Sequence, residues 1–237
     1  MQHFLSIGLV GYLTAFSGFF LAGVFCFAVG KLGNRFLGTM MGFTAGIIIA
    51  FICFELIPGS LERFGLYKGI IAMLLGVALS AWLEGRLGEF HRYEKAGLLL
   101  VLGVTIHNIP EGMALGSLLH VSFPAGVSLA IMIAAHCFPE GLAVMLPFKQ
   151  AGAKASKMLA LSLLVPIPMS VGALSGALIS SSSPLFVDAC LCFSGGVMLY
   201  IACGNILPES KDVWRGRMSA IGAMLGFVAG VWLTAKL

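Results

Sequence analysis

Long apolar segments constrain this chain more than any other feature of its sequence. A helix needs about 20 apolar residues to cross the hydrocarbon core of a bilayer. Eight apolar windows, joined by short polar connections, follow one another along the 237 residues. They fall at residues 5–30, 36–58, 67–84, 97–119, 123–147, 158–180, 185–208 and 217–236. The sequence therefore predicts an all-α, polytopic membrane protein with eight transmembrane helices, folded as a single domain over residues 1–237.

The composition supports this interpretation and argues against a nucleic-acid-binding role. Hydrophobic residues make up 59% of the chain and charged residues only 10%. The mean hydropathy of +1.02 lies far above that of soluble domains. The net charge is +4, but the 14 Lys and Arg residues are scattered between apolar segments instead of clustering on one face. All six cysteines lie within apolar windows, where they do not indicate a disulfide framework.

The basic residues predict which side of the membrane faces the cytoplasm. With eight spans, every second connection lies on one side, and that side holds eleven basic residues: Lys31, Arg35, Arg86, Arg92, Lys95, Lys149, Lys154, Lys157, Lys211, Arg215 and Arg217. The opposite side holds the other three: Arg63, Lys68 and Lys236. Cytoplasmic loops are enriched in Lys and Arg. We therefore expect a multi-pass protein of the cell (inner) membrane with both termini extracytoplasmic.

An internal repeat relates the second and third spans to the seventh and eighth. A shift of 150 positions aligns residues of spans 2 and 7: Phe43 with Phe193, Gly46 with Gly196, Cys53 with Cys203, Pro58 with Pro208, and Ser60 with Ser210. It also aligns residues of spans 3 and 8: Ile71 with Ile221, Leu75 with Leu225, Gly76 with Gly226, Trp82 with Trp232, and Leu83 with Leu233. Because an odd number of spans separates them, the two copies cross the membrane in opposite directions. Inverted repeats of this kind are typical of secondary transporters.

The fourth and fifth spans carry the same motif, His-x-x-Pro-Glu-Gly. The motif begins at His107 and, 29 positions later, again at His136. Each copy starts about ten to thirteen residues into its span, which at about 1.5 Å per residue is near the middle of the hydrocarbon. Residues i and i+4 share a helix face. His107 therefore projects together with Glu111, and His136 with Glu140.

This pattern predicts a metal site between two helices. A charge at mid-bilayer costs several kcal/mol unless it is paired or coordinates an ion. Two imidazoles and two carboxylates suit Zn²⁺, and also Fe²⁺, Mn²⁺ or Cd²⁺. Asn108 and Cys137, one position further along each helix, are additional candidate ligands, with helix-packing contacts as the alternative. Pro110 and Pro139 lack the N–H that would bond the preceding turn, so we expect a loosened helix and a cavity beside the ligands.

Together these features resemble the ZIP (Zrt-, Irt-like protein) family of divalent metal transporters. The resemblance rests on the two motifs, the first of which reads His-Asn-x-Pro-Glu-Gly, and on eight spans that cover the whole chain. It implies that inverted repeats of spans 1–3 and 6–8 surround spans 4 and 5. It also implies uptake of zinc, iron or related ions towards the cytoplasm, with the metal as substrate rather than catalytic cofactor. A homodimer is left open. The residues that match the family's metal site are His107, Asn108, Glu111, His136 and Glu140.

Two departures from the family pattern concern further metal positions. Many relatives carry a Glu-Pro pair in span 6 whose carboxylate completes a second metal position, whereas this chain reads Pro-Ile-Pro at 166–168. Span 7 often carries His-Glu before its Pro-Glu, whereas here Gly204 and Asn205 precede Pro208 and Glu209. We therefore expect one strongly bound metal at the centre.

Three polar residues are candidate relays between the central site and the two mouths. Glu55 is expected near the outer end of span 2, while its repeat equivalent Asn205 and the nearby Glu209 are expected near the inner end of span 7. The alternative is that these side chains are interfacial and satisfied by water. Four other ionisable residues are expected to be solvated near the surface: Asp188, His3, His91 and His120.

An intramembrane zinc-dependent hydrolase is the main alternative function, because zinc beside two glutamates could activate water. The sequence contains no His-Glu-x-x-His motif. Four protein ligands would also fill a tetrahedral zinc and leave no open position for catalysis. A metal sensor or a purely structural site is disfavoured by the inverted repeat. The sequence therefore predicts a transporter and not an enzyme.

Overall fold

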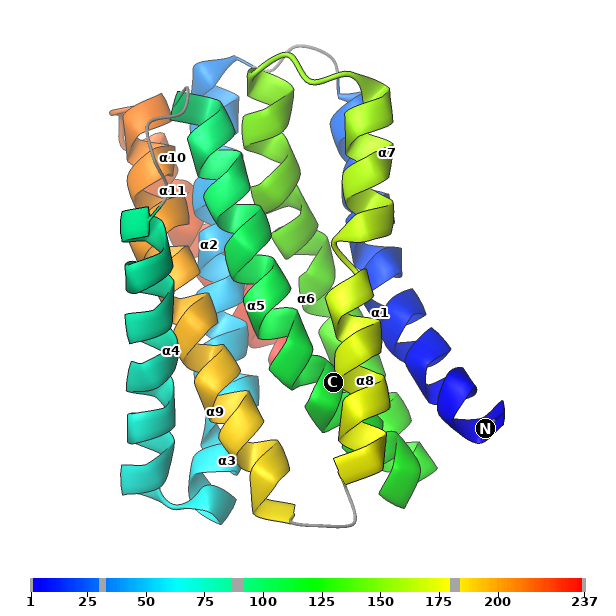
Figure 1. The fold of residues 1–237 in the computed structure, drawn as a ribbon. Helices are drawn as coiled ribbons and strands as arrows, with labels where there is room; N and C mark the ends of the chain where they lie inside the picture. Colours follow the sequence, from blue (N-terminus) through cyan, green and yellow to red (C-terminus); the bar gives the residue numbers. More distant parts are fainter. Residues whose placement is uncertain (1, 30–32, 87–91, 180–183, 236–237) are drawn as a thin grey trace.

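The apolar windows fold into long helices that run side by side along one bundle axis (Figure 1). The computed structural model describes residues 2–29, 33–86, 92–179 and 184–235, and all regular structure within these ranges is helical. The elements are α1 (Gln2–Ala28), α2 (Asn34–Phe51), η1 (Ile52–Leu56), α3 (Ile57–Phe64), α4 (Leu66–Arg86), α5 (Arg92–Val121), α6 (Phe123–Gln150), α7 (Ala155–Leu164), α8 (Ile167–Ile179), α9 (Pro184–Tyr200), η2 (Ile201–Ile206), α10 (Leu207–Val213) and α11 (Met218–Thr234).

The described residues contain seven helical segments that are long and apolar enough to cross a membrane. An eighth, shorter apolar helix, α11, occupies the position of the last predicted span. The prediction of an all-α, polytopic membrane protein is therefore confirmed. Three of the predicted spans are each built from more than one element: α2, η1 and α3 form the second, α7 and α8 form the sixth, and α9, η2 and α10 form the seventh.

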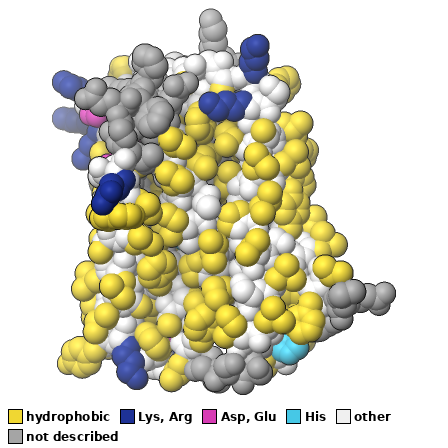
Figure 2. Space-filling view, in the orientation of Figure 1, with side chains coloured by type: hydrophobic (Ala, Val, Ile, Leu, Met, Phe, Trp, Pro, Cys, Tyr) yellow, Lys and Arg dark blue, Asp and Glu magenta, His cyan; other side chains and the backbone are white. Residues whose placement is uncertain are grey.

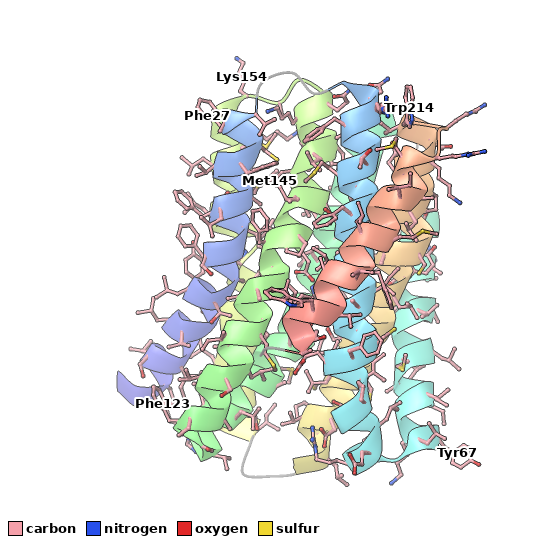
Figure 3. The ribbon with its side chains drawn as sticks, turned by 180° about the vertical axis from the view of Figure 1, so that it is seen from behind. Phe27, Tyr67, Phe123, Met145, Lys154 and Trp214 are labelled. Carbon is pink, nitrogen blue, oxygen red and sulfur yellow. The ribbon has the colours of Figure 1, made fainter. Side chains whose placement is uncertain are left out.

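The two ends of the bundle differ in charge. Successive crossings alternate in direction, so Lys154 and Trp214 lie at one end and Tyr67 and Phe123 at the other (Figure 3). Most of the Lys and Arg side chains on the face seen in Figure 2 gather near its upper end, above a wide apolar belt. This is the arrangement that the loop charges predict. Four of the basic residues counted in the sequence, Lys31, Arg92, Lys95 and Lys236, lie wholly or with their side chains outside the described residues.

Two π-helical turns mark the inverted repeat in the structure. The turns η1 and η2 come just before Pro58 and Pro208, which the sequence shift of 150 aligns. A proline cannot donate the usual i→i−4 hydrogen bond, and a wider turn accommodates the interrupted ladder. Around these turns α2 packs against α11, and α9 packs against α4. The same pairing therefore occurs twice, once in each orientation.

Glycines allow these paired helices to approach at backbone distance. A Cβ added to Gly46 of α2 would collide with the carbonyl oxygen of Ala223 in α11. The shift of 150 converts this contact into one between Gly196 of α9 and the carbonyl oxygen of Met73 in α4, which the structure also contains. Small residues at helix crossings permit the close van der Waals packing on which membrane helices depend. The reciprocal contacts support the predicted inverted repeat.

The glycine that ends each central motif has the same role. Gly112 of α5 lies against the backbone of α8 at Met169, and Gly141 of α6 lies against α1 at Phe19 and Ala22. Each central helix is thus backed by one outer helix, α8 for α5 and α1 for α6. The close backing leaves the opposite face of each central helix to carry the ionisable side chains.

The expectation of loosened helices at the central prolines is wrong. Both α5 and α6 remain α-helical through Pro110 and Pro139. Neighbouring helices can hold a proline-containing membrane helix in place, and the close backing by α8 and α1 does so here. The chain instead changes its helical geometry before Pro58 and Pro208, and it breaks between α7 and α8.

Candidate metal centre

Four ionisable side chains from α5 and α6 meet inside the bundle as two cross-helix pairs. Nε2 of His136 lies 3.3 Å from a carboxylate oxygen of Glu111, and Nε2 of His107 lies 3.1 Å from a carboxylate oxygen of Glu140. None of the four residues is more than 5% exposed. The sequence predicted that these residues face one another across the two helices. The structure adds that each histidine approaches the glutamate of the other helix.

A cavity of about 740 Å³ reaches one of these pairs. Its walls come from α2, η1, α3, α5, α6 and α9, and His136 is among the lining residues. It also includes Val121, which is 71% exposed, so the cavity opens at the end of the bundle where α5 ends and α6 begins. That end is the one marked by Phe123 in Figure 3. We call His136 and Glu111 the cavity-side pair.

The other pair, His107 and Glu140, is sealed by apolar side chains and is called the sealed pair. The adjoining residues are buried and leave only a narrow void: Ile48, Leu100, Val104, Ile201 and Ile206. No described cavity of comparable size leads from this pair to the end of the bundle that carries the basic side chains. Among the described residues, the one large cavity therefore reaches the centre from a single side.

Several polar atoms of the sealed pair have no hydrogen-bond partner. Both carboxylate oxygens of Glu140 and Nε2 of His107 are buried without a hydrogen-bond partner, although Nε2 lies 3.1 Å from one of these oxygens. Nδ1 of His107 lies 3.1 Å from the carbonyl oxygen of Gly103, a contact that assigns the ring proton to Nδ1. The Nε2 lone pair is then directed towards Glu140. Metal-binding histidines are commonly oriented in this way.

The donor set therefore fits a divalent ion. Unpartnered polar atoms in a buried site cost free energy, and an unpaired charge costs more. An ion held by imidazole nitrogen and carboxylate oxygen would satisfy these atoms at once. Zinc and its neighbours in the transition series accept this combination of ligands.

Comparison with known proteins agrees with this chemistry. Residues 83–235, more than half of the chain, match the family model described as ZIP Zinc transporter. The chain belongs to the ZIP family. Its relatives include Zinc transporter GufA of Myxococcus xanthus, 36% identical over 179 residues that cover 70% of this chain and 69% of the relative. Zinc transporter ZupT of Corynebacterium glutamicum is 28% identical over 252 residues, covering 90% of this chain and 93% of the relative.

A vertebrate protein is also similar. Zinc transporter ZIP11 of Xenopus tropicalis is 32% identical over 139 residues, covering 55% of this chain and 41% of the relative. Membership of the ZIP family makes this protein a divalent-metal transporter and not an intramembrane hydrolase. The metal is accordingly its substrate and not a catalytic cofactor.

Two further candidate ligands adjoin the four central residues of this ZIP protein. The Sγ atom of Cys137 lies with one ligand atom each of His136 and Glu140 in a group whose members are within 4.8 Å of one another. Asn108 donates from Nδ2 to the carbonyl oxygen of Val165 at 3.3 Å, at the break between α7 and α8, while its Oδ1 has no partner. The amide is thus anchored with its oxygen unused. Both residues remain predicted ligands.

The three predicted mouth relays lie in different surroundings. Glu55 lines the large cavity together with His136. Asn205 instead donates to Glu84 at 3.2 Å, and the Tyr200 hydroxyl donates to the same carboxylate oxygen at 2.6 Å. This group lines a small separate void and does not adjoin the four central ligands. Glu209 is half-buried near the start of α10.

The prediction that Asp188 is solvated is wrong. Asp188 is only 4% exposed and lines the cavity, where its carboxylate accepts a 2.7 Å hydrogen bond from the guanidinium of Arg63. Arg63 lies on α3 and Asp188 on α9, so this ion pair joins elements 125 positions apart and has no local sequence signal. Of the histidines expected at the surface, His120 is exposed, His91 lies outside the described residues, and so does the side chain of His3.

Sequence reasoning also missed Ser194. This buried residue of α9 places its hydroxyl 3.2 Å from a carboxylate oxygen of Glu111. A single serine in an apolar span carries no signal of its own. The internal repeat could have singled it out, because the shift of 150 aligns it with another buried hydroxyl residue, Thr44.

Proposed function

We propose that this protein carries zinc, or a related divalent ion such as iron, manganese or cadmium, across the membrane towards the cytoplasm. The metal is held by His107, Glu111, His136 and Glu140. The single observation that carries the proposal is the buried group of imidazoles and carboxylates, partly without hydrogen-bond partners, at the closed end of a one-sided cavity. Residues 1–237 act as one transport domain.

The charges of the centre favour binding followed by release. Two carboxylates and two neutral imidazoles sum to −2, which one divalent ion neutralises. An ion arriving through the cavity meets His136 first, because His136 lines the cavity and the sealed pair lies behind it. Release on the far side then requires the apolar seal around His107 and Glu140 to open. The inverted repeat provides two arrangements of similar energy for such an exchange.

The charge distribution supports the proposed direction of transport. The cavity opens at the end of the bundle that has few basic side chains. Since the basic end is cytoplasmic under the positive-inside rule, the open cavity faces outwards and the sealed side faces the cytoplasm. We place the protein in the cell (inner) membrane with both termini extracytoplasmic.

Metal flux into sealed liposomes tests the proposal. Purified protein should take up Zn²⁺ down its gradient, and parallel assays with Fe²⁺, Mn²⁺ and Cd²⁺ should rank the substrates. Protein-free liposomes and liposomes loaded with chelator alone set the background. Binding of zinc without any flux would favour a sensor or a structural site and would contradict transport.

Orientation can be tested with single cysteines. A cysteine replacing Ser122, in the connection between α5 and α6, should react with a membrane-impermeant thiol reagent added to intact cells. A cysteine replacing Lys154, in the connection that follows α6, should be protected until the cells are permeabilised. Both positions are at least partly exposed, so access and not burial decides the result. Labelling of the Lys154 position alone would reverse the assigned direction.

Glu55 should strengthen capture of the ion. Its carboxylate lines the cavity with His136, whereas the other lining carboxylate, Asp188, is paired with Arg63. We expect Glu55→Gln to raise KM for zinc uptake about threefold to tenfold with little change in maximal rate, because lost attraction lowers the local ion concentration. The effect should shrink at high ionic strength. Glu62→Gln, at an exposed carboxylate of α3 that does not line the cavity, is the matched control.

A further inference from the structure

Ser194 joins α9 to the cavity-side pair. Its hydroxyl lies 3.2 Å from a carboxylate oxygen of Glu111 and 3.4 Å from the main-chain carbonyl of His107, so its one proton can be donated to either. Among the described residues outside α5 and α6, Ser194 alone has a side chain hydrogen-bonded to one of the four central ligands. Ser194 is fully buried.

The two sequence repeats map this contact onto a second one. The shift of 150 aligns Ser194 with Thr44 of α2, and the shift of 29 aligns Glu111 with Glu140. The helices pair accordingly, since α9 packs against α5 and α2 packs against α6. The contact of α2 with α6 reaches the metal centre, where the ring of Phe51 lies 5.5 Å from that of His136.

The depths of the two hydroxyl residues also correspond. Ser194 is ten residues from the start of α9, and Glu111 is ten residues from the end of α5, at the same end of the bundle. Thr44 is ten residues from the start of α2, and Glu140 is ten residues from the end of α6, at the opposite end. At a constant rise per residue, each hydroxyl lies near the level of its carboxylate.

The second contact is not made in this structure. Thr44 is fully buried, yet its hydroxyl has no hydrogen-bond partner, and both carboxylate oxygens of Glu140 also lack one. Thr14 and Thr39, by comparison, each donate to the main-chain carbonyl four residues earlier. A buried unpaired hydroxyl is costly. By the symmetry of the repeats the Thr44 hydroxyl corresponds to that of Ser194, and Glu140, whose only close polar contact is the 3.1 Å approach to His107, corresponds to Glu111. The unbonded hydroxyl therefore indicates a hydrogen bond that is formed in another conformation.

We infer that Ser194 and Thr44 are paired positioning residues, each of which stabilises one end state of transport. When the cavity faces outwards, Ser194 holds Glu111 and Thr44 is unbonded. When the centre faces the cytoplasm, Thr44 donates to Glu140 and Ser194 releases Glu111. This inference rests on the proposed transport function. In each state one of the two carboxylates accepts a hydrogen bond from a hydroxyl, and the exchange balances the energies of the two states.

Two reporter cysteines measure the ratio of outward-facing to inward-facing protein, using the full-length protein in liposomes. One replaces Ser128, which lines the open cavity, and the other replaces Leu99, its equivalent under the shift of 29 in the sealed half. The reporters are introduced one at a time into a background in which the native cysteines other than the buried Cys137 are alanine. An impermeant thiol reagent is added in the absence of metal, from the outer side for the Ser128 position and from the cytoplasmic side for the Leu99 position. The ratio of the two labelling rates reports the ratio of outward to inward states.

The inference predicts opposite shifts of this ratio. Thr44→Val removes a bond of the inward state and should raise the ratio about fivefold, the usual net effect of one hydrogen bond. Ser194→Ala removes a bond of the outward state and should lower the ratio about fivefold. Thr44→Ser and Ser194→Thr keep the hydroxyl and should stay within about twofold of the parent, which a purely steric role would not predict.

Other outcomes overturn the inference. Shifts in the same direction, or no shift in either variant, contradict the exchange of hydrogen bonds. Monodisperse elution in detergent checks folding. If valine disturbs packing, Thr44→Ala is used in place of Thr44→Val. The direction in which this variant shifts the labelling ratio then decides whether Thr44 stabilises the inward state. Zinc uptake by the parent protein separates the two proposals, because absent uptake refutes transport, whereas intact uptake without opposite shifts refutes only the exchange.

Discussion

Glu140→Gln should reduce the initial rate of zinc uptake more than about 100-fold at low zinc. Glutamine keeps the size of the side chain but removes one negative charge, so a bound divalent ion would leave a net charge of +1 at the centre. Uncompensated charge within a membrane costs several kcal/mol, and each 1.4 kcal/mol corresponds to about tenfold in affinity. Glu140 is buried and its carboxylate oxygens have no hydrogen-bond partner that could compensate for the loss.

A concentration series of zinc and a matched variant make this result interpretable. A higher zinc concentration should restore only part of the uptake rate, since the ion must also pass the sealed pair, where the Glu140 carboxylate is missing. Glu62→Gln removes a carboxylate from the exposed surface of α3 and should retain normal uptake. Normal flux in a variant carrying both Glu111→Gln and Glu140→Gln would rule out these residues as the metal site.

The sequence predicted that the histidines and glutamates of spans 4 and 5 lie together, as the structure shows, because that part of the geometry is local. An i, i+4 spacing determines which face of a helix carries His and Glu, and two copies of the motif in consecutive spans must face each other or the lipid. The pairing across helices could not be predicted in the same way. Whether His136 approaches Glu111 or Glu140 depends on the relative height and rotation of α5 and α6, which their packing on α8 and α1 determines.

The long-range contacts could not be predicted from the sequence either. The ion pair of Arg63 with Asp188 and the hydrogen bond of Ser194 to Glu111 join residues more than 80 positions apart. The inverted repeat was visible in the sequence as aligned residues. The π-helical turns before Pro58 and Pro208 were not, because proline alone does not specify how the interrupted turn is accommodated.

The conformation of the centre illustrates a further limit. The shift of 29 aligns Leu129 and Ile133, which line the open cavity, with Leu100 and Val104, which seal His107. Side chains of similar character thus line a cavity on one side and pack together on the other. Local pattern cannot decide which half is open when both halves are built alike. That ambiguity is what a protein needs in order to alternate between two states.

One zinc ion per chain should bind tightly, and a second should bind at least about 100-fold more weakly. The two carboxylates and two imidazoles are neutralised by the first ion, so a second would leave +2 inside the membrane. No acidic side chain is available from span 6, which reads Pro-Ile-Pro at 166–168 and contributes the carbonyl of Val165 to Asn108 instead. Ionised Cys137, in contact range of His136 and Glu140, would offset one unit at most.

Equilibrium dialysis with metal analysis should therefore give a stoichiometry near one over a wide range of zinc concentration, and anomalous diffraction should show one dominant peak. Cys137→Ser provides the matched variant, because serine preserves the size of the side chain but is a poorer ligand for soft metals. If Cys137 supports the second ion, this change should weaken the second binding step and leave the first nearly unchanged. Two peaks of equal occupancy bridged by Glu111 and Glu140 would show that another group supplies the missing charge, and the charge argument for a single tight site would then be wrong.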